Sequence, residues 1–313
     1  MRTLLLATLM CLSLWGDAHI FVYHRFGDAT HSSTNTSIDI LRKHFEYFKK
    51  HNYKVVPLSK LNAALKNSEK IPDNWVVLNI DDSYKSFYEN GLPLFKQYNY
   101  PFTLFVYIEA TEKSYGDFMT WNQIQDSAHY GEIALHSYAH HHMASMKHEE
   151  IISDTQKAYD TFEAKMGFKP KYYAYPYGEY TDETKKAIKS FGFELIMNQN
   201  SGAINHLSDP YDLDRIALTG DVNLKPKLAM KALNAIWFEP KSYPKDGNLK
   251  RIHAKIAPSI NRAEYYLSGY GWEYTKVENG DINITLDRKL KFSRNRLFLK
   301  SGRYQSSTIL VKP

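Results

Sequence analysis

Short apolar runs alternate with amphipathic stretches between residues 19 and about 222. Trp75–Ile80 is rich in residues that suit a buried strand. Ser37 can cap a helix that runs to about His51, and Glu149–Met166 predicts a second helix that ends at Gly167. Strands that alternate with helices favour a mostly parallel sheet or barrel, so we expect an α/β fold.

Other segments of this region continue the alternation. Thr120 and Gln123 predict the capping box of a helix, and Thr181 can cap another helix that ends at Gly192. Further strands are predicted at Ile20–Tyr23, Tyr53–Val56, Phe102–Tyr107, Glu132–Leu135, Lys171–Tyr175 and Phe193–Met197.

The pattern changes near Lys225. A short helix is predicted at Pro226–Ala232, and after it β-like runs are separated by Gly and Asn turns. We therefore expect a signal peptide at 1–18, an α/β domain at 19–222 and a small β-rich C-terminal domain at 223–313. Carbohydrate binding by this last domain is a hypothesis. The β-like runs are Glu264–Leu267, Ile282–Leu286 and Ser307–Val311.

The first eighteen residues resemble a signal peptide. Arg2 gives a positive start, Leu4–Trp15 is apolar but short for a membrane span, and Gly16-Asp17-Ala18 offers small residues for cleavage after Ala18. An uncleaved anchor is the alternative. Cys11 has no small residue before it, which argues against a lipoprotein. We expect an exported protein, periplasmic or extracellular, without stable membrane insertion once the signal is removed.

Composition limits the chemistry available to the mature chain. The 313 residues are 43% hydrophobic and 24% charged, which is typical of a folded globular protein. Cys11 is the only cysteine, so the mature chain would have no disulfide, and any metal must be held by His and carboxylates. The net charge of +6 is modest, and because no supporting motif accompanies it we expect no nucleic-acid partner.

Polar residues stand where four predicted strands end. His24, the Asp81-Asp82 pair, His136 and Pro176 each follow such a strand. In α/β folds the chemistry gathers at the carboxyl ends of the strands. We therefore expect these residues to meet at one edge of the sheet.

His136 and His140 have the spacing of two metal ligands. Two His four residues apart lie on one face of a helical turn, so both imidazoles can reach one ion. With Asp82 they form a set of two His and one carboxylate that suits Zn²⁺ and several other divalent ions. His141 and His142 are either neighbours of this site or part of a polar loop.

Three segments together resemble the polysaccharide deacetylase family (carbohydrate esterase family 4, the NodB-homology fold). Asp81-Asp82 is similar to the paired aspartates of the family. His136-Ser137 with His140 is similar to its His-Ser/Thr-x-x-His metal motif, and Pro176-Tyr177-Gly178 to the core of its third motif. The resemblance covers roughly residues 20 to 220.

The resemblance implies a distorted, incomplete (β/α) barrel and a role for each matched residue. Asp82, His136 and His140 would hold a divalent metal, with Zn²⁺ as first choice and Co²⁺ or Ni²⁺ as alternatives. Asp81 would be the general base. The backbone N–H of Tyr177 and the metal would share the oxyanion.

The chain also departs from the family pattern. Ser83 stands where the family usually has Gly, and Ala174 where many members carry an Arg that orients the base. We find neither the Trp-bearing fourth motif nor the late His that acts as general acid. These losses resemble the subgroup that acts on poly-β-1,6-N-acetylglucosamine. His24 fits the opening strand of that subgroup and is predicted to line the pocket.

The resulting hypothesis is a metal-dependent hydrolase that removes N-acetyl groups from an amino-sugar polysaccharide, either poly-N-acetylglucosamine-like or the glycan of peptidoglycan. Two alternatives stand beside it. One is a weakly active or inactive glycan-binding protein of the same fold, and the other is an O-deacetylase. The polymer, its linkage and the oligomeric state stay open.

Overall fold

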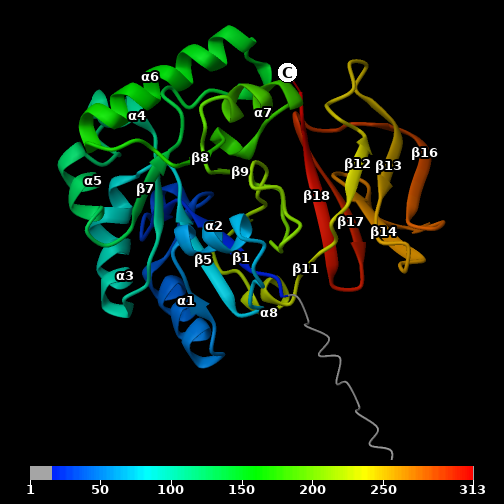
Figure 1. The fold of residues 1–313 in the computed structure, drawn as a ribbon, viewed down its shortest axis with the longest axis horizontal. Coiled ribbons are helices and arrows are strands. Elements are labelled where there is room, and N and C mark those ends of the chain that lie inside the picture. The colour runs from blue at the N-terminus through cyan, green and yellow to red at the C-terminus, as the bar shows by residue number, and fades with distance from the viewer. Residues whose placement is uncertain (1–15, 313) are drawn as a thin grey trace, which may run out of the picture.

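The computed structural model of the protein describes residues 16–312, which form two units that lie side by side (Figure 1). One unit is built on a parallel sheet flanked by helices, and the other contains the C-terminal β-strands. Most of the predicted signal peptide, residues 1–15, lies outside the described residues.

The first unit is built on eight strands whose neighbours all pair in parallel. Their order is β10-β1-β5-β6-β7-β8-β9, with β4 joined to β5. This half-barrel confirms the α/β class and the incomplete barrel expected from the sequence. The strands are β1 (His19–Tyr23), β4 (Lys54–Val55), β5 (Trp75–Ile80), β6 (Thr103–Val106), β7 (Glu132–Leu135), β8 (Tyr172–Ala174), β9 (Leu195–Met197) and β10 (Ile216–Ala217).

The two end strands of this sheet are linked by the segment between them. Met197 at the end of β9 forms a parallel bridge with Leu213, and the N–H of Asn198 donates to the carbonyl oxygen of Leu213 at 3.0 Å. β10 begins three residues after Leu213 and pairs with β1. Arg215, the residue before β10, is therefore carried across the open side of the half-barrel.

Helices follow most of these strands. Ser37 begins α1, since its Oγ accepts the N–H of Ile40 at 3.2 Å. Thr120 and Gln123 form the predicted capping box, and Gly167 ends α6 with φ +76°. The helices are α1 (Ile38–Lys50), α2 (Leu58–Lys66), the π-helix η2 (Phe87–Gly91), α3 (Leu92–Tyr98), α4 (Ile108–Glu112), α5 (Trp121–Ser127), α6 (His148–Met166), α7 (Asp182–Lys189) and α8 (Leu224–Leu228).

Alternate residues of the parallel strands enter two separate cores, as the two-residue period of a strand requires. In β5, Leu78 and Ile80 pack in the larger core with Phe45 of α1 and Phe95 of α3. Val77, the residue before Leu78, points to a smaller core that also holds residues of α2. A sheet buried on both faces fixes where its strand ends lie, and the candidate site is built there.

The second unit consists of two small sheets that share one core. The first has the order β11-β18-β17-β14-β15 and the second β12-β13-β16, with antiparallel pairs except for β11 with β18. This confirms a β-rich C-terminal region. The strands are β11 (Lys231–Ala232), β12 (Ile236–Glu239), β13 (Asn248–Lys255), β14 (Arg262–Leu267), β15 (Gly271–Lys276), β16 (Asp281–Lys289), β17 (Arg294–Ser301) and β18 (Tyr304–Val311).

The helix predicted at Pro226–Ala232 was misplaced. The helix α8 covers Leu224–Leu228, and Lys231 and Ala232 instead form strand β11 beside β18. Local sequence favours continuing the helix, but pairing with a strand more than seventy residues later determines the outcome.

Several contacts join the two units. Ser201 donates its N–H to Oγ of Ser307 at 2.7 Å, and Arg296 donates to the carbonyl oxygen of Gln199 at 3.2 Å. Lys231 forms an ion pair with Asp17 at 3.1 Å. In Figure 1, β18 runs along the boundary between the units.

Asp17 and Ala18 belong to the folded first unit. Ala18 and Ile204 exchange two backbone hydrogen bonds of 2.8 Å, and Oδ1 of Asp17 accepts from Asn205 and from the N–H of Ala232 at 3.3 Å each. Cleavage after Ala18, which stays a prediction, would remove these contacts. Within residues 16–312, we find no helix both long and apolar enough to cross a membrane.

Candidate metal centre

Asp82 is aimed into the site by two consecutive residues in the left-handed conformation. β5 ends at Ile80, and Asp82 and Ser83 follow with φ of +72° and +56°. This region is costly for residues with a Cβ and natural for glycine, which explains why Gly is expected where Ser83 stands. Asp81 is held beside β1 because its N–H donates to the carbonyl oxygen of Tyr23 at 2.9 Å.

His136 and His140 lie in a loop after β7, so the predicted helical turn was wrong. Ser137 and His140 have φ of +64° and +52°, and the N–H of His140 donates to Oγ of Ser137 at 2.9 Å. Asp154 of α6 accepts the N–H groups of Tyr138 and Ala139, at 3.0 and 2.9 Å. The four-residue spacing still brings both imidazoles together, because left-handed residues reverse the loop.

The three predicted ligands meet. Nε2 of His136 lies 3.2 Å from Oδ1 of Asp82, and Nε2 of His140 lies 3.0 Å from the same oxygen. The three donor atoms all lie within 4.8 Å of one another. Asp82 and His136 are buried, and His140 is partly buried. This group, far apart in sequence, could hold a metal ion.

The hydrogen bonding of His136 tests whether the group fits a cation. Its Nδ1 lies 2.7 Å from the carbonyl oxygen of Ala174, which can only accept, so Nδ1 carries the proton. In the neutral ring, Nε2 is then an acceptor that faces the carboxylate oxygen of Asp82. Two acceptors at this distance repel unless a proton or a cation lies between them. The donor set of two imidazole nitrogens and a carboxylate suits Zn²⁺.

The titration of these groups is governed by burial and by their mutual charges. Burial raises the pKa of Asp82, but the neighbouring imidazoles of His136 and His140 lower it more, and the net shift is well below the usual range. Burial lowers the pKa of His136, while the carboxylates of Asp81 and Asp82 raise it, and the net shift is upward. The carboxylates therefore favour positive charge at this point.

Asp81 lies alongside the three ligands and is held by an arginine that the sequence analysis missed. Nη1 and Nη2 of Arg215 donate to the two carboxylate oxygens of Asp81, at 2.7 and 2.8 Å, and Nε donates to the carbonyl oxygen of Asn198 at 2.7 Å. Both side chains of the pair are fully buried. Burial raises the pKa of Asp81, but the charges of Arg215 and His136 lower it more, so the carboxyl is ionised.

Comparison with known proteins identifies the family. Residues 68–196 match the family model described as polysaccharide deacetylase. The poly-β-1,6-N-acetyl-D-glucosamine N-deacetylase of Escherichia coli (strain K12) is 23% identical over 272 residues, covering 72% of this chain and 40% of the relative. The Staphylococcus aureus (strain MRSA252) protein of that name is 24% identical over 214 residues, covering 64% and 73%.

The chain carries a region of the polysaccharide deacetylase family, at residues 68–196. It spans well under half the length of the Escherichia coli relative. Two solved structures have a similar fold. Streptococcus pyogenes deacetylase PplD in complex with acetate has a TM-score of 0.61 at 20% identity, and IcaB from Ammonifex degensii 0.59 at 24%. Each alignment covers 66% of this chain and 93% of the other.

Arg215 holds Asp81, whereas Ala174 stands where many family members carry an Arg that orients the base. Ala174 ends β8 and supplies only its carbonyl oxygen, to His136. Arg215 reaches Asp81 from the opposite end of the sheet, in the segment before β10. The sequence gives little signal for it, because it is a single cation separated from Asp81 by 134 residues.

His24 lies near both aspartates. Burial lowers its pKa, against the opposing charges of Asp82 and Asp81. Among the residues that the structure describes, its Nδ1 is a buried atom with no hydrogen-bond partner. Its place in the pocket and its catalytic part both stay predictions.

Tyr177 lies over the ligands in the turn after β8. Its φ is +59°, and its ring centroid is 4.6 Å from that of His140. His142 stacks on it, with centroids 4.0 Å apart and planes within 7°. Nδ1 of His142 lies 2.8 Å from Glu179, whose other oxygen accepts from Arg294 of the C-terminal unit at 3.4 Å. His142 is therefore a neighbour of the site.

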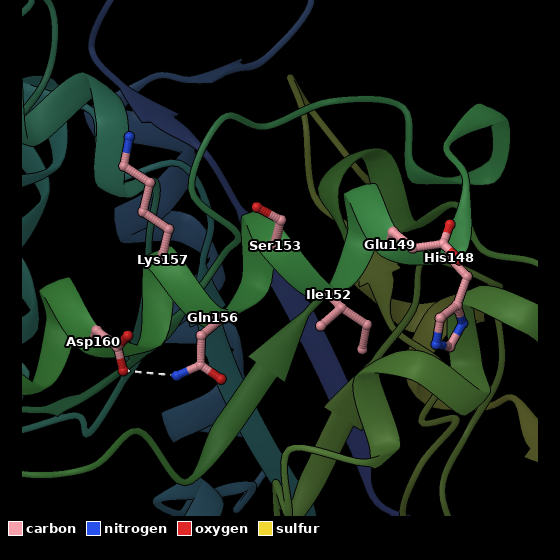
Figure 2. A pocket seen from close by; sticks show the side chains of 7 residues that line it. All are labelled: His148, Glu149, Ile152, Ser153, Gln156, Lys157 and Asp160. Carbon is pink, nitrogen blue, oxygen red and sulfur yellow. Dashed lines mark hydrogen bonds between the residues drawn. The ribbon is translucent and has the colours of Figure 1, made fainter.

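A separate hollow lies on the outer side of α6 (Figure 2). Figure 2 shows Gln156 bonded to Asp160, with Ser153 and Lys157 pointing away from the helix. None of its lining residues belongs to the metal group or to the Asp81 pair. We therefore locate the chemistry at the strand ends.

Proposed function

We propose that the protein is a metal-dependent hydrolase that removes N-acetyl groups from an amino-sugar polysaccharide. The observation that carries the proposal is the second buried acid, Asp81, beside the group of Asp82, His136 and His140. A structural metal site needs only ligands, whereas an ionised acid held next to them by Arg215 can move a proton.

Asp82, His136 and His140 would hold the ion, with Zn²⁺ as first choice and Co²⁺ or Ni²⁺ as alternatives. A divalent ion bound there would supply Lewis-acid chemistry and lower the pKa of a bound water toward about 7. The hydrogen bond from His136 to Ala174 orients the ring for this task.

Asp81 would take the proton of the attacking water. Its carboxylate is ionised, and the two-pronged contact with Arg215 fixes its orientation. The backbone N–H of Tyr177 would donate to the oxyanion as charge develops there. His24 would line the pocket and contact the sugar or the leaving amine.

A poly-N-acetylglucosamine-like chain is the substrate that we favour, and the glycan of peptidoglycan is the alternative. The names of the Escherichia coli and Staphylococcus aureus relatives support this choice. A signal-peptide-like start supports export to the periplasm or the exterior, where such polymers occur.

The decisive assay measures acetate released from β-1,6-linked N-acetylglucosamine oligomers by protein loaded with Zn²⁺, Co²⁺ or Ni²⁺. We expect Asp81→Asn to lower kcat by about 10²–10⁴-fold, the usual worth of a positioned base. Asp160→Asn, an exposed acid on α6, is the matched control and should keep full activity.

Equal release by wild type and Asp81→Asn would mean that Asp81 is not the base. If the protein binds the N-acetylglucosamine oligomers but releases no acetate with any of the three metals, a glycan-binding protein of the same fold is favoured instead. Release from O-acetylated but not N-acetylated sugars would identify an O-deacetylase.

A further inference from the structure

Three aromatic rings form a cluster on one face of the C-terminal unit. Tyr266 of β14 pairs with Trp272 of β15 on one side and with Phe298 of β17 on the other. Their centroids lie 5.4, 5.7 and 6.1 Å apart. Tyr274 lies two residues beyond Trp272 on the same face. We call Tyr266, Trp272, Tyr274 and Phe298 the aromatic face.

The aromatic face is open, although the unit has a complete core without it. Trp272 is 47% exposed and Tyr274 is 67% exposed. The alternate residues of the same strands, including Tyr265, Leu297 and Leu299, are buried in the core between the two sheets. A group of large exposed rings on one face is typical of a binding surface, because burying it would be favourable.

β17 connects this face to the rim of the candidate site. Arg294, Arg296 and Phe298 alternate along the strand, so their side chains lie on one face. Arg294 contacts Glu179, which in turn holds His142, and Arg296 contacts the carbonyl oxygen of Gln199. Phe298 is four residues, or about 13 Å, along the strand from Arg294. The aromatic face therefore continues outward from the region around Tyr177.

We propose that the aromatic face binds the polysaccharide chain whose acetyl groups are removed at the metal centre. This inference rests on the proposed function and names a second binding region for the same substrate. The apolar face of a pyranose ring packs on an aromatic ring. The exposed rings of Trp272 and Tyr274, two residues apart on one face of β15, can therefore each hold a sugar of an extended chain.

The charges around the rings favour the acetylated chain over the deacetylated one. Arg262 lies over Tyr274, with its guanidinium 4.5 Å from the ring centroid, and Nζ of Lys300 lies 5.5 Å from the Trp272 ring. Lys276 pairs with Arg262 across the strands, and Glu264 is the one acid among them by register. This net positive surface suits a neutral N-acetylated polymer and repels the ammonium groups of the product.

The test uses the full chain and two lengths of substrate, soluble poly-β-1,6-N-acetylglucosamine and its trisaccharide. We expect the double variant Trp272→Ala/Tyr274→Ala to bind the polymer about tenfold more weakly, which corresponds to about 1.4 kcal/mol. Its kcat/KM should fall by a similar factor on the polymer and stay unchanged on the trisaccharide. Phe292→Ala, at a ring that is 52% exposed in the loop before β17, is the matched control.

Trp272→Phe/Tyr274→Phe keeps the rings and should keep most of the affinity, which makes the test independent of any folding defect in the Ala variant.

The proposal would be overturned if the Ala variant bound the polymer with wild-type affinity. It would also be overturned if the protein bound deacetylated polymer more tightly than acetylated polymer. A ring-dependent dimer in sedimentation, without ring-dependent glycan binding, would overturn it in favour of a second copy. Ring-dependent binding without acetate release would leave this proposal standing while the proposed function fails.

Discussion

At the scale of single residues, the pair of Arg215 and Asp81 determines whether a buried acid can act as a base. We predict that Arg215→Met raises the pKa of Asp81, because burial would no longer be opposed by the guanidinium. The acid limb of the pH profile of kcat/KM should then move to higher pH. Breaking a buried pair should also lower the free energy of unfolding by about 3–5 kcal/mol.

Two variants accompany this measurement. Arg215→Lys keeps the positive charge and loses the two-pronged geometry, so its acid limb should lie between those of wild type and Arg215→Met. Arg251→Met removes a half-exposed ion pair with Glu239 and should change stability by no more than about 1 kcal/mol. An unshifted pH profile in active Arg215→Met would contradict the role given to this arginine.

His19 makes the stability of the fold depend on pH. It is buried at the start of β1, where its Nε2 donates to the carbonyl oxygen of Met230 at 3.0 Å. Burial lowers its pKa from 6.5 to about 4. The unfolded chain therefore takes up a proton before the folded chain does. The contribution of His19 is complete above pH 6.5 and is lost as the pH falls toward 4, by roughly 3 kcal/mol in all.

Urea unfolding at pH 7 and pH 4.5 measures this loss. We expect His19→Gln, which cannot titrate, to lose less stability between the two pH values than wild type does. His129→Gln, at an exposed position, should follow the wild-type behaviour. The same loss in wild type and in His19→Gln would show that another group is responsible.

At the scale of elements, the sequence predicts segments whose structure depends on local pattern. β5 and β7 begin and end where the apolar runs do, and Ser37 and Thr120 begin helices as their side chains allow. The loop that carries His136 and His140 was mistaken for a helical turn. A spacing of four residues fits a helical turn and this loop equally well. The two differ only in the left-handed residues, which contacts with α6 fix.

In the candidate site too, the residues set by local pattern were predictable and those set by long-range contacts were not. Asp82 and the two His ligands were predictable because strand ends converge and the motif supplies their spacing. Arg215 was not predictable, since it reaches Asp81 from the segment that closes the half-barrel, and closure is a property of the whole sheet. The pairing of β11 with β18 was also missed, because it joins strands that are far apart in the sequence.

At the scale of the whole molecule, a line of contacts that begins at Arg294 connects the C-terminal unit to the candidate site. Arg294 of β17 donates to Glu179, which is 2% exposed, and Glu179 holds the imidazole of His142. His142 stacks on Tyr177. The position of Tyr177, and with it the backbone N–H proposed for the oxyanion, therefore depends in part on the second unit.

We predict that Arg294→Met lowers kcat on the trisaccharide roughly tenfold with little change in KM, because small misplacement of a group that acts in the transition state is costly. Arg294→Lys should restore part of the loss. Arg296→Met removes another contact between the units, to Gln199, while leaving Glu179 and His142 in place. If both Met variants lose kcat equally, the loss comes from weaker docking between the two units. The contacts from Arg294 through Glu179 to His142 would then have no specific effect. If only Arg294→Met loses it, the β-rich unit helps to position Tyr177 through Glu179 and His142.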